Sequence, residues 1–226
     1  MSGKSRVFIP VLATTLALAG CAGTRPIPYS GIASSVQLSP NQGKNANHVP
    51  YSYATAVDWR SYTNVIVDQV QVYSGQDSQF EKISDNDKIE LAQYMGETFR
   101  EQLRQHFNVV GDASLPNTLR VRLTLTGAKK TTAFVSTFTR FDLAGAPYNV
   151  VQSIRGGQGT FTGSVSYAVE IYDAASGRLL SAYIEKQYPN AMNVGATFGG
   201  LSASKAGVRK GANELVAKLG DSGDLR

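Results

Sequence analysis

The chain has 226 residues, a formal net charge of +5, two histidines and a single cysteine. Common zinc sites use clustered cysteine and histidine, so this composition argues against a metal centre. The basic side chains are scattered along the chain. Nucleic-acid-binding proteins usually carry a denser basic stripe, so no nucleic-acid partner is expected.

The N-terminus has the three-part build of a secretory signal. Lys4 and Arg6 supply positive charge, and residues 7–18 form an apolar run. A stable spanning helix needs about 20 apolar residues, so this run is too short to be one. The sequence therefore predicts a signal peptide over residues 1–20.

The signal ends in Leu18-Ala19-Gly20-Cys21, which resembles the lipobox of bacterial lipoproteins. The resemblance implies a diacylglyceryl thioether and an acyl group such as palmitate on Cys21. Each buried CH₂ contributes roughly 0.8 kcal/mol, so several chains hold a protein firmly in a membrane. The alternative is an ordinary signal peptide, which leaves Cys21 as a free thiol with no partner.

The residue after the cysteine indicates which membrane a bacterial lipoprotein is delivered to. Ala22 stands where an Asp tends to retain enteric lipoproteins in the inner membrane. The resemblance thus implies an outer-membrane lipoprotein with its body in the periplasm. Cleavage before Cys21 removes Lys4 and Arg6. The mature chain then keeps 20 of the 22 basic side chains and all 17 acidic ones, so its formal net charge is +3.

Residues 21–50 are rich in Pro, Ser, Gly and Asn and show no hydrophobic period. This composition predicts a lipidated N-terminus and tether, which as a free coil spans about 30 Å. Docking on the body is the alternative, and its candidates are apolar: Tyr29, Ile32, Val36 and Leu38.

The remaining residues, 51–226, are expected to form one globular domain. Residues 64–73 are β-branched and predict a strand. Ser84 followed by Asp87 indicates an N-cap with a capping box, opening a helix that runs to about His106. Its apolar stripe has helical spacing and contains Ala92, Met95, Phe99, Leu103 and Phe107.

Three further strands are predicted, together with a short one at 109–110. Residues 119–125 alternate, with four apolar side chains facing in and Arg120 and Arg122 facing out. Residues 165–173 and 180–184 form a hairpin around the turn 173–177, with Leu180, Ala182 and Ile184 as its second apolar row. A last helix begins at about Ser202.

These elements predict an α+β single domain. Its sheet is mainly antiparallel or mixed, with about four to five strands, and the two helices pack on one face. An insertion interrupts the domain at about 131–158. Phe134, Phe138 and Phe141 lie in it among small hydroxyl residues, and they form either part of the core or a partner-binding or membrane-contacting flap.

The sequence contains no catalytic constellation. It lacks the Gly-x-Ser-x-Gly elbow of serine hydrolases, and His106 suits the negative end of the helix it terminates. Asp85, Asp87 and Glu90 suit the positive end of the same helix. No catalytic residue, metal ligand or cofactor is predicted.

Several segments resemble the DUF3313 family of bacterial lipoproteins. They are Tyr29-Ser30-Gly31, residues 57–62 running into Val65-Ile66-Val67-Asp68, residues 117–124 and residues 168–180. The resemblance implies an envelope lipoprotein of unassigned function and supplies no catalytic residues.

The expected function is that of a non-enzymatic envelope accessory protein or protein-binding module at the outer membrane. Its expected partners are the membrane, through the lipid, and another envelope protein or an envelope polymer. The alternative is an envelope hydrolase or small-ligand carrier, which requires a cleft that joins His106 with a carboxylate and a hydroxyl. The oligomeric state is left open.

Overall fold

A computed structural model describes residues 25–131, 163–189 and 200–220. One 3₁₀ turn, η1 (Trp59–Ser61), and two helices, α1 (Asp85–Leu103) and α4 (Ser202–Gly220), lie in these ranges. The strands are β1 (Ser39–Pro40), β2 (Tyr51–Ala54), β3 (Asn64–Val67), β4 (Gln71–Val72), β5 (Gln79–Glu81), β6 (Asn108–Val109), β7 (Thr118–Lys129), β8 (Ser164–Asp173) and β9 (Leu179–Gln187).

All nine described strands belong to one mixed sheet. Seven of them follow the order β1-β2-β9-β8-β7-β3-β6, and the other two, β4 and β5, pair with β7. β7 is its centre: it pairs antiparallel with β8 on one side and parallel with β3, β4 and β5 in succession on the other. The prediction of four to five strands is therefore too low. The short strand predicted at 109–110 is β6, and the strand predicted over 64–73 is divided into β3 and β4. The missed strands β1, β2 and β5 have only two to four residues, too few to show a period of two.

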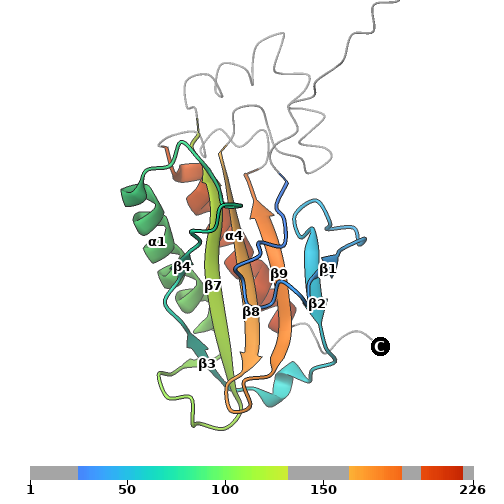
Figure 1. The fold of residues 1–226 in the computed structure, drawn as a ribbon. Coiled ribbons are helices and arrows are strands. Elements are labelled where there is room, and N and C mark those ends of the chain that lie inside the picture. The colour runs from blue at the N-terminus through green and yellow to red at the C-terminus, as the bar shows by residue number, and fades with distance from the viewer. Residues whose placement is uncertain (1–24, 132–162, 190–199, 221–226) are drawn as a thin grey trace, which may run out of the picture.

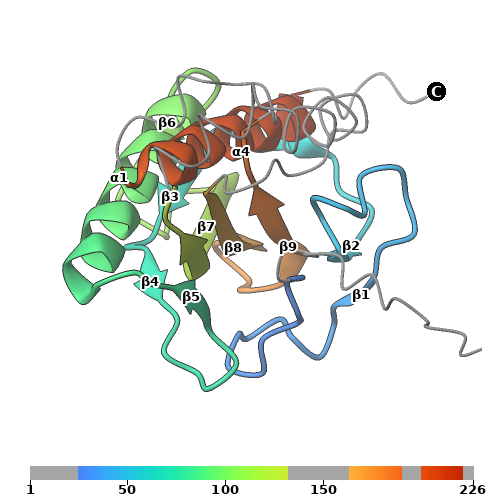
Figure 2. The ribbon, with the colours of Figure 1, turned by 90° about the horizontal axis from the view of Figure 1, so that it is seen from above.

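Both helices lie on the same face of the sheet, as predicted (Figures 1 and 2). The capping box of α1 is present: the Ser84 side chain accepts a hydrogen bond from the Asp87 amide, and the Asp87 side chain accepts one from the Ser84 amide. Its apolar stripe is buried against the sheet. α1 ends at Leu103 rather than at His106, because a turn brings Phe107 back into the core.

The predicted facing of β7 is confirmed. Leu119, Val121, Leu123 and Leu125 are almost fully buried in the cluster beneath the helices. Arg120 and Arg122 lie on the other face, where both approach Asp68. The turn after β8 contains Gly177 at φ 68°, a conformation that a residue without a Cβ adopts freely.

The second face of the sheet is covered in part by the N-terminal segment, seen in Figure 1 crossing in front of β8 and β9. Tyr29 and Ile32 are buried there with Ala168 and Ile184. The free-coil interpretation is therefore wrong from Arg25 on, and the docking alternative holds for Tyr29 and Ile32 and for Leu38, which is partly buried against them. Val36 remains 87% exposed.

β9 faces differently from the prediction of one apolar row. Ile184 packs on the N-terminal segment, whereas Leu180 packs under the helices. The pairing shifts by one residue between Ile171 and Tyr172, which leaves Leu180 as the extra residue. Such a bulge rotates the residues after it to opposite faces. Tyr183 consequently turns toward α4.

The described residues contain no helix that is both long and apolar enough to cross a membrane.

Candidate functional site

The site residues predicted from the sequence, Cys21 for lipidation and Phe134, Phe138 and Phe141 for partner binding, lie outside the described residues. The chain around the aromatic segment is described. Lys129 pairs with Ser164 at the end of the β7–β8 ladder, so this segment leaves and re-enters the body at one place.

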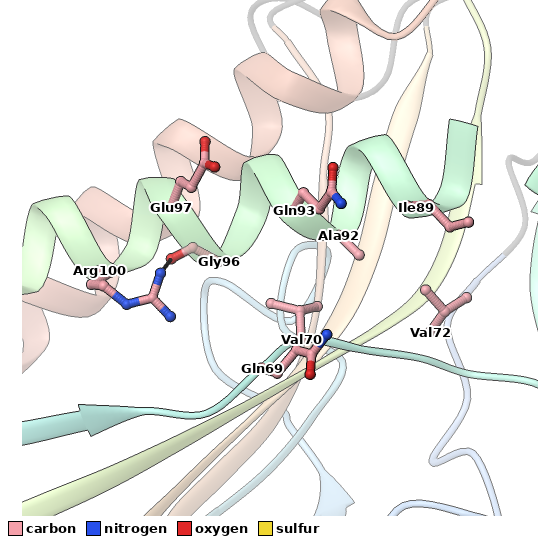
Figure 3. A pocket seen from close by; sticks show the side chains of 9 residues that line it. All are labelled: Gln69, Val70, Val72, Ile89, Ala92, Gln93, Gly96, Glu97 and Arg100. Atoms are coloured by element: carbon pink, nitrogen blue, oxygen red, sulfur yellow. Dashed lines mark hydrogen bonds between the residues drawn. The ribbon is translucent and has the colours of Figure 1, made fainter. Parts of the chain in front are cut away.

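A groove runs between α1 and the edge of the sheet at β4, and we call it the α1–β4 groove (Figure 3). Its volume is about 390 Å³. The lining combines aliphatic and polar side chains: Gln69, Val70, Val72, Ile89, Ala92, Gln93, Gly96, Glu97 and Arg100.

The groove has an apolar floor and polar ends. Val70 and Val72 point from the strand edge toward α1 (Figure 3) and rest on the core. Ile89 faces them from the first half of the helix and is 53% exposed. At the other end, the Arg100 guanidinium donates long hydrogen bonds of 3.4 Å to the carbonyls of Gly96 and Val67. The exposed part of Ile89 adds apolar surface to the groove.

No other described strand pairs with the strand edge beside the groove. β6 covers only the start of β3, at Asn64 and Val65. Among the described strands, β4 and β5 pair with β7 alone. An uncovered edge presents backbone donors and acceptors that a further strand can pair with.

A second hollow of about 700 Å³ lies on the opposite face, between the N-terminal segment and the strands. Its charged groups already have partners. Glu170 is 4% exposed and accepts a hydrogen bond of 2.8 Å from the Ser34 amide. Asp68 pairs with Arg120 at 2.9 Å and with Arg122 at 3.3 Å. These charges hold the segment and the strands together.

A buried carboxyl group lies under α4. Glu185 is 2% exposed, and the amide of Gln187 donates to it at 2.5 Å and to Glu214 at 2.6 Å. The pKa of Glu185 is raised to about 8: burial raises it most, the hydrogen bond from the Gln187 amide lowers it, and the neighbouring carboxyl of Glu214 raises it. Glu185 therefore holds a proton at neutral pH.

Glycines in α4 permit this close packing. A Cβ on Gly207 would lie 2.9 Å from the side chains of Gln187 and Val165, and one on Gly211 would collide with the Tyr167 hydroxyl. That hydroxyl is electrostatically close to Glu185 but makes no hydrogen bond of good geometry in the described part of the chain. Glu185 and Gln187 are buried and line neither hollow, whereas the Glu214 side chain is 50% exposed.

Net positive charge gathers at one end of the body, which we call the β5 end. It contains the N-termini of α1 and α4 (Figure 1), the strand β5 and the loop between β1 and β2, where the His48 carbonyl accepts a hydrogen bond from the Lys186 amide. Its basic residues are Arg25, Lys44, Lys82, Lys88, Lys129, Lys130, Lys186 and Lys205, and its acidic residues are Asp77, Glu81, Asp85, Asp87 and Glu90. The other described residues include nine basic and nine acidic side chains, so their formal charges cancel.

Neither hollow brings together the groups that a hydrolase requires. His106 is exposed beyond the end of α1, and His48 stacks on Tyr188 with ring centroids 4.8 Å apart. Neither histidine lines a hollow. In the ranges that the structure describes, no three His, Cys, Asp or Glu side chains gather around a point where a metal ion would fit.

The described residues form an α+β fold whose one sheet carries two helices on one face. Residues 28–215 match the family model described as "Protein of unknown function (DUF3313)". The chain belongs to the DUF3313 family, which confirms the resemblance seen in the sequence. No curated protein matches it.

The solved structures to which the chain is similar share little sequence with it. The PelC dodecamer from Paraburkholderia phytofirmans is 13% identical over 72% of this chain and 92% of that chain, with a TM-score of 0.37. A hypothetical protein from Chlamydia trachomatis is 10% identical over 70% of this chain and 98% of that chain, with a TM-score of 0.41. A protein from Xanthomonas campestris is 8% identical over 74% and 94%, with a TM-score of 0.33.

Sequence reasoning missed both the groove and the buried carboxyl. Ile89 lies off the apolar stripe that was predicted for α1, and this displacement was the available signal for the groove. For the carboxyl, the signal was the four-residue spacing of Gly207 and Gly211, which is typical of a helix that packs closely on its neighbour.

Proposed function

We propose that this protein is a lipid-anchored envelope protein that acts without catalysis, by binding an extended segment of another envelope protein in the α1–β4 groove. One observation carries the proposal: a groove with an apolar floor lies directly beside a strand edge that no other described strand pairs with. A peptide that adds a strand at β4 gains backbone hydrogen bonds, and its alternate side chains reach the groove.

The lining of the groove fits a peptide. Val72 and Ile89 offer aliphatic surface to an apolar side chain. Gln69 and Gln93 offer amides, and Glu97 and Arg100 offer opposite charges to the polar groups of the same segment. The attachment to the membrane is inferred from the lipobox at Cys21, and the expected location is the periplasmic side of the outer membrane.

A photo-crosslinking experiment tests the groove in the lipidated protein within its own envelope. A photoreactive residue at Gln93, in the groove, should capture a partner, and one at Glu101, exposed on the same helix, should not. Ile89→Asp should abolish the cross-link, because a carboxylate in the apolar groove loses its hydration on binding. Asn86→Asp adds the same charge outside the groove and is the matched control.

Equal cross-linking from Gln93 and Glu101 would remove the support for the groove. Lipid attachment has its own readout: the wild-type protein should incorporate fatty acid, and Cys21→Ser should not. If the wild-type protein takes up no fatty acid and fractionates as soluble, the lipid anchor is wrong. The cross-links then still test the groove independently.

The aromatic segment around Phe134, Phe138 and Phe141 is proposed as a second contact with the partner. Because Thr131 and Gly163 flank a single strand ladder, a short Gly-Ser turn in place of residues 132–162 closes β7 onto β8. The product should fold and stay anchored while it loses cross-links. An unfolded product would show that these residues are core, and undiminished cross-linking would confine the contact to the groove.

A further inference from the structure

The N-terminal segment fixes where the chain enters the body. Arg25 is the first described residue, and its carbonyl accepts a hydrogen bond of 2.9 Å from the Gln79 amide in β5. Tyr29 is 1% exposed, packs edge-on against Tyr73 and donates to Gln79 at 3.0 Å. The chain is therefore held firmly at β5 before it leaves toward Cys21.

The link between Cys21 and Arg25 is short. Four residue steps of fully extended chain span at most about 14 Å. If lipid on Cys21 lies in a membrane, Arg25 stays within that distance of its surface, and the end of the body that carries Arg25 must face the membrane.

The end of the body that carries Arg25 is the β5 end. It accounts for the whole formal net charge of the described residues. Eight basic side chains there outnumber five acidic ones, while the rest of the body balances. Four of the basic side chains form ion pairs at this end, among them Lys130 with Asp87 at 2.7 Å and Lys205 with Glu90 at 2.7 Å. Lys44 and Lys82 are exposed. Both helices also point their positive N-termini toward this end.

We propose that the β5 end docks on anionic phospholipid headgroups of the membrane that holds Cys21. This inference rests on the proposed lipid attachment. Anionic headgroups attract basic residues only within about a Debye length, roughly 8 Å at physiological ionic strength, and the short link keeps the β5 end close to that range. The strands and both helices then stand end-on to the bilayer, and the α1–β4 groove opens sideways above it.

The test uses the one cysteine of the chain. Because lipid occupies Cys21, a cysteine introduced elsewhere is the sole free thiol and accepts a fluorophore. Asn86→Cys reports from the β5 end and Ser114→Cys from the opposite end, and both sites are exposed and uncharged. The lipidated proteins are placed in vesicles of phosphatidylcholine, with or without 30% phosphatidylglycerol, that contain a quencher at the headgroups.

In anionic vesicles we expect quenching at Asn86→Cys to exceed that at Ser114→Cys several-fold. Lys44→Glu with Lys82→Glu changes the charge of the β5 end by four units and should remove most of the difference. Arg60→Glu with Arg104→Glu makes the same change at the far end and should leave it intact. Equal quenching at both positions, or a difference that survives the reversal at the β5 end or appears equally in neutral vesicles, overturns the proposal.

A second measurement separates this inference from lipid attachment. Intact mass shows whether Cys21 carries fatty acids. The unacylated Cys21→Ser chain should sediment with phosphatidylglycerol vesicles at low salt, at least tenfold more than the Lys44→Glu, Lys82→Glu form. A protein without fatty acid whose unacylated chain still binds in this way overturns the anchor alone. An acylated protein whose unacylated chain ignores anionic vesicles overturns the docking surface alone.

Discussion

α1 and α4 each span 19 residues and cover the same face of one sheet, yet they close it to different degrees. α4 lies so near β8 and β9 that Gly211 has no room for a Cβ. α1 stands off the edge at β4 and leaves the α1–β4 groove. The contrast shows that local side-chain size, more than helix length or stripe, decides whether a helix seals a sheet or leaves a surface for a partner.

The largest effect is expected within α1 itself, between its two sides. Phe99 is fully buried and lies edge-on to Tyr167, so Phe99→Ala should cost about 3–5 kcal/mol in the free energy of unfolding. Ile89→Ala, in the groove, should cost less than about 1 kcal/mol. Chemical denaturation measures both. Similar losses would mean that the groove is part of the core and would break the contrast.

The seal under α4 is tested next. Gly211→Ala should cost about 1–3 kcal/mol, because the new methyl collides with a buried tyrosine. Tyr167→Phe removes the colliding hydroxyl, so the double variant should recover part of the loss, which a double-mutant cycle measures. Gly220→Ala, with open space around its Cβ, is the control on the same helix. Additive losses in the cycle would show that the two groups do not meet.

The buried carboxyl under α4 predicts a pH dependence. The pKa of Glu185 rises from an ordinary 4.5 to about 8 in the folded protein. The unfolded chain therefore ionises first, and the contribution of Glu185 to stability, complete below pH 4.5, is lost as pH rises through about 8.

Glu185→Gln keeps an acceptor for the Gln187 amide and removes the titration. The variant should be more stable than wild type at pH 8, by an amount on the order of 1–3 kcal/mol, and the two should converge near pH 4. Urea midpoints between pH 4 and 8 measure the difference, and Glu101→Gln, at an exposed position, is the control. A constant difference across this range would mean that Glu185 is not protonated in the fold.

The smallest effect is expected at the glycine of α1 that corresponds to Gly211. A Cβ on Gly96 would lie 3.3 Å from the Val70 side chain, which has the groove beside it to move into. Gly96→Ala should therefore change stability by no more than about 1 kcal/mol, in the stabilising direction, because alanine favours the helix. A loss as large as that at Gly211 would show that α1 is as tightly sealed as α4.

The sequence by itself determined the elements whose signals are local. Ser84 and Asp87 marked the start of α1, the alternation of Leu119 to Leu125 gave the correct face of β7, and the turn at Asp173 to Gly177 lies where its residues predicted. Each of these signals involves residues a few positions apart, so propensity, capping and period reveal them without knowledge of the rest of the chain.

Only the tertiary structure decided the rest. β4 and β5 are strands because β7 pairs with them, and segments of two or three residues carry no period of their own. The facing of Ile184 depends on a bulge and on Tyr29, which arrives from the far end of the chain to bury the second face. Glu185 is buried because the glycines of α4 let this helix pack closely on the sheet. The groove exists because α1 does not pack directly on β4. Each depends on groups distant in sequence, and their packing sets burial, charge and access.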